Sequence, residues 1–173
     1  MKVSLDIIGR QKGIRELVYP IRHQVFEVEM GFPSEDGLVL CELDALSNHY
    51  VLLSADTREP IGVVSIADIT GIDPLLEKWK IDPSLKVVKP HKLAILQEFR
   101  NRIDLRSLLV PIKREIEGYD YATVHVTQPS DNSDYTRHLD WADEYEACFG
   151  FKQIGLDQKP SGAKMVIMGR SIH

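Results

Sequence analysis

The sequence has few cysteines and no long hydrophobic run, and both features narrow the class of protein. Its two cysteines, Cys41 and Cys148, lie far apart in a chain of 173 residues. They form neither a metal-binding motif nor a disulfide framework, so we expect reduced, buried thiols and no metal site. No apolar run approaches the ~20 residues of a membrane span, and no signal-like apolar segment follows Asp6. We therefore expect a cytoplasmic protein that does not enter a membrane.

Positive charge is also scarce in this sequence. Lysine and arginine number 21 against 26 acidic residues, which leaves a net charge of -5. This balance disfavours a nucleic-acid-binding protein that relies on a large basic face. Hydrophobic residues make up 43% of the chain, which is ordinary for a globular protein of this length. We expect a single domain over residues 1–173, and the oligomeric state stays open.

Hydrophobic periodicity predicts a mixed α/β chain built around one sheet. Helices are expected at 11–30, 73–80 and 105–118, and in a further segment that Gly150 ends. Pro20 predicts a kink or a new helix start within the first of them. The polar segment 56–60 is typical of a hairpin turn. Strands are expected at 2–8, 50–53, 61–66, 93–96, 121–126, 151–156 and 164–169.

The stretch 90–109 is the candidate binding element of the chain. Its first half contains the apolar strand segment, and its second half has apolar residues at helical spacing. Arg100 and Arg102 lie in the turn between them. The first N–H groups of a helix have no intrahelical partner, and guanidinium groups bind phosphate well. This strand, turn and helix therefore predict a site for a phosphorylated cofactor.

Three parts of the chain resemble the GNAT acyltransferase family. Residues 93–102, LAILQEFRNR, are similar to the family's fourth strand and the start of its pyrophosphate loop. Residues 148–155, CFGFKQIG, are similar to the end of its last helix and the strand that follows. A narrower branch, the N-acyl amino acid synthases and acyl-homoserine-lactone synthases, resembles the chain at Arg22, Val25, Phe26, Glu29, Gly31, Glu42, Leu43, Asp44 and His49.

The resemblance implies the GNAT fold, which has a single central, mostly antiparallel sheet with a splayed fourth strand and helices on both faces. It also implies an N-acyltransferase that moves an acetyl or longer acyl group from a thioester to the amine of a small molecule or amino acid by direct attack. The implied donor is acetyl-CoA or another acyl-CoA, and an acyl carrier protein (ACP) is the alternative donor and partner.

The phosphate loop departs from the family pattern in a way that keeps alternatives open. Asn101, Ile103 and Leu105 stand where the family usually has glycine, which lets the backbone approach the pyrophosphate. An acyl-ACP donor has no adenosine pyrophosphate, so a long-chain acyl-ACP-dependent signal synthase is one alternative. The other is a catalytically inactive GNAT-like module that binds a ligand or a partner.

The resemblance assigns candidate roles to individual residues. His91, Glu42, Asp44 and His49 are candidate bases, Glu42 and Asp44 could instead bind the amine, and Tyr145 is the candidate acid. The pKa of histidine, near 6.5, suits a base. Backbone N–H groups near Ile95 and Leu96 would face the thioester oxygen. The remaining candidates for donor binding are Arg100, Asn101, Arg102, Ile103, Asp104 and Leu105, and those for substrate binding are Arg22, Phe26 and His49.

A structural role is the alternative for each of these residues. Glu42 or Asp44 could form an ion pair with Arg22, and His49 could be a structural residue. The segment 100–102 could be a solvated turn. The aromatic stripe of Trp141, Tyr145 and Phe149 is typical of a helix face in the core rather than of an acyl pocket.

Overall fold

The computed structural model describes residues 3–8, 14–54, 56–72, 74–100, 102–103, 112–128 and 141–173. The chain divides into two compact units, each made of two segments. The first unit comprises Met1–Ala67 and Pro90–Glu117, and the second comprises Asp68–Lys89 and Gly118–His173. The expectation of one domain over the whole chain stays a prediction.

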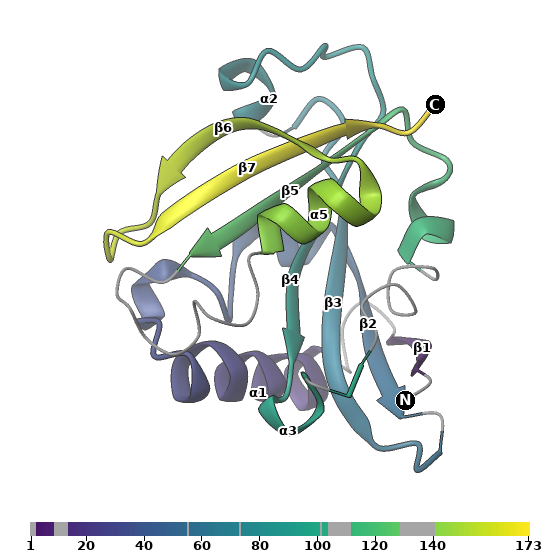
Figure 1. Cartoon of the computed structure of the whole chain (residues 1–173), viewed down its shortest axis with the longest axis vertical. Helices are drawn as coiled ribbons and strands as arrows, with labels where there is room; N and C mark the ends of the chain where they lie inside the picture. The colour runs from purple at the N-terminus through teal and green to yellow at the C-terminus, as the bar shows by residue number, and fades with distance from the viewer. Residues whose placement is uncertain are drawn as a thin grey trace. The chain divides into compact units, whose positions relative to one another are not determined.

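The strands of the first unit pair mainly antiparallel. β1 (Val3–Ile8) pairs with β2 (Ser47–Ser54), which pairs with β3 (Pro60–Asp68). The predicted hairpin turn is confirmed, because Ser54 N donates to Glu59 O at 3.0 Å. β4 (Val87–Ile95) enters this unit at Pro90 and lies beside β3 (Figure 1). The amide of Leu96, just after β4, donates to Ile61 O at 3.0 Å.

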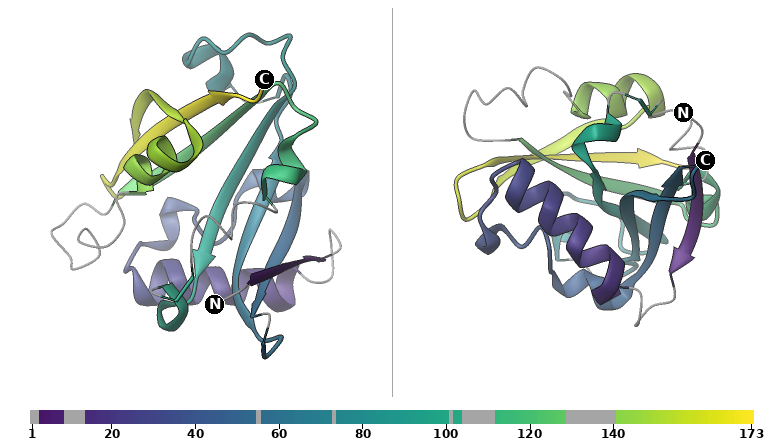
Figure 2. Two further views of the ribbon diagram at one scale, coloured as in Figure 1. Left: turned by 45° about the vertical axis from the view of Figure 1, so that its right-hand side comes forward. Right: turned by 90° about the horizontal axis from the view of Figure 1, so that it is seen from below.

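The first predicted helix forms three consecutive segments, η1 (Ile14–Val18), α1 (Tyr19–Arg22) and η2 (His23–Glu29). The ribbon runs through them as one coil (Figures 1 and 2). Pro20 lies in the first turn of α1, which is the position predicted for it. The coil continues through Pro20 without a break. Val18, Arg22, Val25 and Phe26 are buried at helical spacing, and η1 contacts β2. The helix therefore turns a face with one arginine toward the core.

The strands of the second unit surround β7. β5 (Tyr121–Gln128) pairs antiparallel with β7 (Lys164–Ser171), which pairs antiparallel with β6 (Lys152–Gln158). α5 (Trp141–Phe149) contacts β6 and lies on one face of these strands (Figure 1). Gly150 follows it with φ +66°, a value that glycine adopts without strain, so the predicted helix end is confirmed.

The parallel pairing of β4 with β5 is short. It comprises Val87 with Tyr121 and Val88 with Ala122. The pairs β1–β2, β2–β3, β5–β7 and β6–β7 are antiparallel. The predicted mixed α/β class with a mostly antiparallel sheet is thus confirmed. The prediction that the fourth strand spans 93–96 was too short, because β4 begins at Val87. Lys89 and Pro90 lie inside it and interrupt its apolar pattern.

Several helical segments are short. η3 (Ser34–Asp36), η4 (Glu42–Leu46) and α3 (Gln97–Arg100) have three, five and four residues. The helix predicted at 73–80 is reduced to α2 (Leu75–Lys78). The helix predicted at 105–118 is described only at 112–116, and its start lies outside the described residues.

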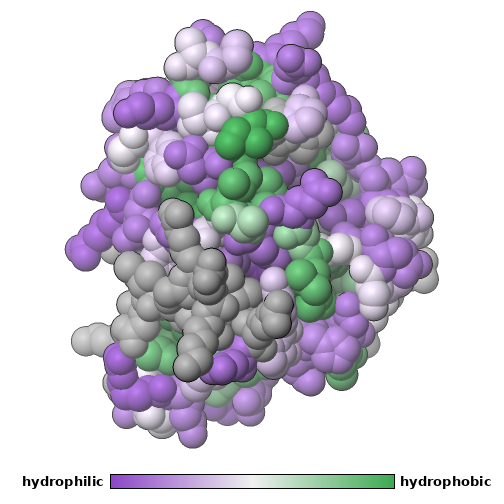
Figure 3. All heavy atoms as spheres, turned by 180° about the vertical axis from the view of Figure 1, so that it is seen from behind, coloured by the Kyte–Doolittle hydropathy of each residue, from purple (hydrophilic) through white to green (hydrophobic). Residues whose placement is uncertain are grey.

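Hydrophobic side chains that reach the surface are interspersed with hydrophilic ones on the face drawn in Figure 3. Exposed examples are Val28, Leu40, Ile72 and Leu156. Single exposed apolar side chains are ordinary in folded proteins. None of the helices in the described part of the chain is long and apolar enough to cross a membrane.

Candidate functional site

A buried ion pair forms the base of a polar cluster in the first unit. Arg22 is fully buried, and its Nη1 donates to Asp44 Oδ1 at 2.9 Å and to Asp44 Oδ2 at 3.0 Å. The same Nη1 donates to Val39 O at 2.9 Å. Asp44 is held by its own turn as well, because the Cys41 amide donates to Asp44 Oδ2 at 3.0 Å. Helix α1 and the turn η4 are thus joined by an ion pair in which both side chains are buried away from water.

A chain of hydrogen bonds continues from this pair to His49. Arg22 Nη2 donates to Ser65 Oγ, so the Ser65 hydroxyl proton is available for His49 Nδ1 at 2.7 Å. His49 Nε2 then donates to Asp44 O at 3.1 Å. This pattern requires a neutral ring, and burial lowers the pKa of His49 below 6.5. His49 is fully buried with both nitrogens engaged, so the geometry favours its structural alternative, and its substrate contact stays a prediction.

Strand β4 is irregular where it meets this cluster. Lys92 has φ +53°, which is rare for a residue with a side chain. In a regular strand, neighbouring side chains point to opposite faces. Here His91 contacts Ser47 beside η4, and its neighbour Lys92 faces Asp44 of η4. The irregularity therefore brings two consecutive side chains of β4 to the same turn.

Lys92 carries a buried cation with little compensation. Its side chain is 7% exposed, and Nζ lies 3.9 Å from Asp44 Oδ2, beyond hydrogen-bond distance. Nζ has no hydrogen-bond partner among the described residues. Burial lowers the pKa of Lys92, the Arg22 charge lowers it further, and Cys41 and Asp44 act in the opposite direction.

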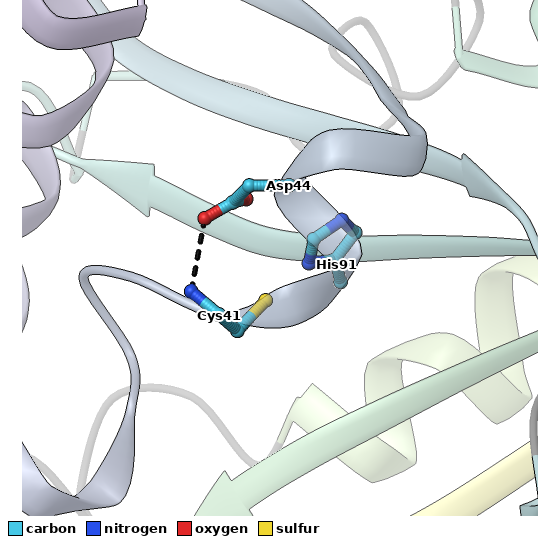
Figure 4. Close-up of side chains that lie close together, drawn as sticks. All are labelled: Cys41, Asp44 and His91. Carbon is cyan, nitrogen blue, oxygen red and sulfur yellow. Dashed lines mark hydrogen bonds between the residues drawn. The ribbon is translucent and has the colours of Figure 1, made fainter.

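His91 lies beside the thiol of Cys41. Ser47 donates its only hydroxyl proton to Leu43 O at 2.6 Å, so its Oγ accepts from His91 Nε2 at 2.8 Å. In its neutral form the ring therefore has its lone pair on Nδ1. Figure 4 shows the Cys41 thiol and the His91 ring turned toward one another, with the Asp44 carboxylate bound to the Cys41 amide.

The side-chain ligand atoms of Cys41, Asp44 and His91 all lie within 4.8 Å of one another. Three such groups could approach a metal ion. The surrounding charge disfavours one, because Arg22 and Lys92 bring two cations to the single carboxylate of Asp44. The surplus positive charge suits an anion at this place better than a divalent cation.

Arg100 is engaged within the first unit. Its Nε donates to Ile95 O at 2.7 Å, and its Nη2 contacts the carboxylate of Glu29. These bonds tie the turn after β4 to helix η2. The geometry favours a structural role for Arg100, and its contact with a phosphate stays a prediction.

The other predicted donor residues are spread over the turn after β4. Ile95 and Ile103 are buried, Leu96 is half-buried and Arg102 is exposed. Asn101, Asp104 and Leu105 lie outside the described residues. Of the remaining candidates in this unit, Phe26 is buried at 8% exposure, and Glu42 is exposed on η4.

Tyr145 belongs to the second unit. Its ring packs edge-on against Phe149 and Phe151, with centroids 6.0 and 5.7 Å away. Burial raises the pKa of Tyr145 to about 12. These contacts favour the core alternative for the aromatic stripe, while the side chain of Trp141 lies outside the described residues. The role of Tyr145 as an acid stays a prediction.

Sequence reasoning brought Arg22, Asp44 and His91 to one site but missed two further members. Cys41 was expected to be an inert buried thiol, yet it is partly exposed beside His91. Lys92 directly precedes the strand predicted at 93–96 and has no role in the sequence-based prediction. A lysine next to the apolar segment 93–96 was the available signal, since the positive φ that turns its side chain inward cannot be seen in the sequence.

No protein-family model matches this sequence, and no curated protein sequence does so either. Solved structures do match. FeeM, an N-acyl amino acid synthase from uncultured soil microbes, has a TM-score of 0.65 at 14% identity, covering 99% of this chain and 91% of its own.

Two further solved structures cover nearly the whole of this chain. BjaI, a CoA-dependent acyl-homoserine lactone synthase, has a TM-score of 0.67 at 12% identity, covering 99% of this chain and 84% of its own. An acyl-CoA N-acyltransferase from Pseudomonas aeruginosa has a TM-score of 0.63 at 13% identity, covering 98% and 100%. The chain therefore has the GNAT fold.

Proposed function

We propose that this protein is an N-acyltransferase, which moves an acyl group from a thioester donor to the amine of a small molecule. One observation carries the proposal: the strained β4 of a GNAT-fold chain presents a histidine whose lone pair is on Nδ1. Amine acylation needs a group that removes a proton from the nucleophile, and a neutral imidazole suits that task near pH 7.

The fixed orientation of His91 supports its role as that base. Its Nε2 is tied through Ser47 to Leu43 O, and this arrangement leaves Nδ1 as the basic atom. Ser47 is fully buried, so the hydrogen bond is shielded from water. A base held by a second hydrogen bond loses less freedom during proton transfer. Asp44, predicted as a base or amine-binding group, is instead proposed to hold the turn beside His91.

The names of two structural neighbours refer to CoA thioesters, which supports the donor class. BjaI is named as CoA-dependent, and the Pseudomonas protein is named as an acyl-CoA N-acyltransferase. For this chain we propose an acyl-CoA or an acyl-ACP donor. The glycine-poor loop and the engagement of Arg100 with Glu29 favour acyl-ACP, whose phosphopantetheine arm lacks the adenosine pyrophosphate.

Thiol release tests this proposal directly. The purified protein is incubated with acetyl-CoA, a long-chain acyl-CoA or an acyl-ACP, each with a pool of small amines. We expect thiol release that depends on the amine, and an amide product in mass spectrometry. A His91→Gln variant should be slower by about 100-fold, the scale of general base catalysis.

The competing function is an inactive GNAT-like binding module. No thiol release from any of the three donors, together with no thermal shift by CoA, would reject the enzyme. A thermal shift without thiol release would favour the binding module.

A further inference from the structure

We propose that acyl transfer in this protein proceeds in two steps through a thioester on Cys41, with His91 as the base that activates the thiol. This inference rests on the proposed function and specifies its route. The direct attack of the amine on the donor, which the family resemblance implies, is the rival route.

The first argument is the arrangement of thiol, base and orienting group. A nucleophile beside a base that a third group holds is the general pattern of covalent catalysis. Here the thiol of Cys41 lies beside His91, within 4.8 Å between their candidate atoms, and Ser47 holds the far nitrogen of the ring. Such contacts are often looser before substrate binds. Cys41 is also partly exposed, as a nucleophile must be.

The second argument is the ammonium of Lys92, which needs a partner. Its side chain is more than nine-tenths buried, and Nζ makes no hydrogen bond of normal geometry to the described residues, although the Cys41 side chain beside it favours the charged form. A buried donor without an acceptor is costly and uncommon. An oxyanion formed on an acyl group at Cys41 would supply that acceptor beside Lys92, at the moment when negative charge develops.

The chemistry of both steps balances without any further reagent. His91 Nδ1 takes the Cys41 proton, sulfur attacks the donor carbonyl carbon, and the donor C–S bond breaks. The departing thiolate receives the proton from His91. In the second step the amine attacks the acyl carbon of Cys41, the new C–S bond breaks, and the proton from the amine returns through His91 to the Cys41 sulfur.

The test is acylation in the absence of an amine. Wild-type protein is mixed with acetyl-CoA, octanoyl-CoA or octanoyl-ACP alone, quenched in acid and examined by intact mass spectrometry and peptide mapping. We expect one acyl group per chain, on the peptide that contains Cys41, and its release by neutral hydroxylamine. Addition of the accepted amine should discharge the adduct and yield one amide.

Two matched variants complete the experiment. Cys41→Ser should lose the adduct and the transfer while it keeps its thermal transition, and Cys148→Ser should keep the adduct. Full transfer by Cys41→Ser would overturn the proposal and leave the proposed function intact. So would wild-type thiol release that occurs only with an amine and without an adduct, or a hydroxylamine-resistant adduct on Lys92. Neither adduct nor thiol release would reject both proposals.

Discussion

Arg22 Nη1 lies 2.9 Å from Asp44 Oδ1 and 3.0 Å from Asp44 Oδ2, in a pair of which neither side chain is more than 6% exposed. The pair connects the first helix to the turn that carries Cys41. A buried pair of this kind does not by itself prove a stabilising contribution, because both charges have lost water. Removal of one partner is costly, since the other charge remains buried.

This asymmetry gives a first prediction. Asp44→Asn should lower the free energy of unfolding by about 3–5 kcal/mol, because it leaves the Arg22 guanidinium buried without a counter-charge. Urea denaturation measures the change. Glu27→Gln is the matched control, since Glu27 pairs with His23 in an exposed i,i+4 pair and should cost below ~0.5 kcal/mol. Equal effects of the two variants would contradict the assigned burial.

Lys92→Met should change the free energy of unfolding in the opposite direction to Asp44→Asn. The Lys92 ammonium is buried without a hydrogen bond, and burial lowers its pKa, so the charged form disfavours the folded state. An apolar side chain of similar length removes that cost and leaves Arg22 to neutralise Asp44. We expect the free energy of unfolding in urea to stay the same or rise by about 1–2 kcal/mol. A loss above ~1 kcal/mol would show that Lys92 contributes a favourable charge interaction.

The sequence predicted part of this site, because residue types and hydrophobic patterns can be recognised from short stretches of the chain. An ion pair of Arg22 with Glu42 or Asp44 was one of the stated alternatives, and it is found with Asp44. His91 was a candidate base next to the predicted strand, and the structure places it in the middle of β4. Lys92 was missed because the direction of its side chain depends on one backbone angle, and Cys41 was missed because its position beside His91 is a tertiary contact between distant parts of the chain. A φ of +53° at Lys92 overrides the strand alternation from which facing residues are inferred. The charged Lys89 likewise interrupts the apolar pattern, so the first third of β4 was not predicted as strand.

Arg100 and Glu29 allow the two interpretations of Arg100 to be separated. If Arg100 is structural, Arg100→Ala and Glu29→Gln should each lower stability by about 1–3 kcal/mol, because each leaves a largely buried charged group without its partner. Thermal or urea denaturation tests this. If Arg100 instead binds the donor phosphate, only Arg100→Ala should abolish the thermal shift caused by CoA.

His125 in β5 predicts a pH dependence of stability. Burial lowers the pKa of His125 to about 3, and the Lys89 and Lys159 charges act in the same direction. Between pH 6.5 and 3 the unfolded chain therefore binds a proton that the folded chain does not, and stability falls as the pH decreases. From pH 7 to pH 5 the wild type should lose up to about 2 kcal/mol more than His125→Gln.

Urea denaturation at both pH values measures this difference for His125. Proton NMR provides an independent check, because the His125 ring should not titrate between pH 7 and pH 5. A ring that titrates near pH 6.5, or an identical loss of stability in both proteins, would show that the histidine is accessible to water.

Gly62 in β3 controls how closely β4 can approach. A Cβ atom at this position would lie 2.5 Å from Ala94 O and 3.2 Å from Ile95 Cα, and backbone atoms cannot move aside as a flexible side chain can. Gly62→Ala should therefore cost about 1–3 kcal/mol of stability and displace the strand that carries His91. Gly118→Ala is the control, because nothing lies within 4 Å of a Cβ atom there.

We expect Gly62→Ala to lower acyl transfer by more than its unfolded fraction explains, and Gly118→Ala to leave transfer unchanged. Equal transfer per folded molecule in both variants would show that the contact between the two strands matters for stability alone.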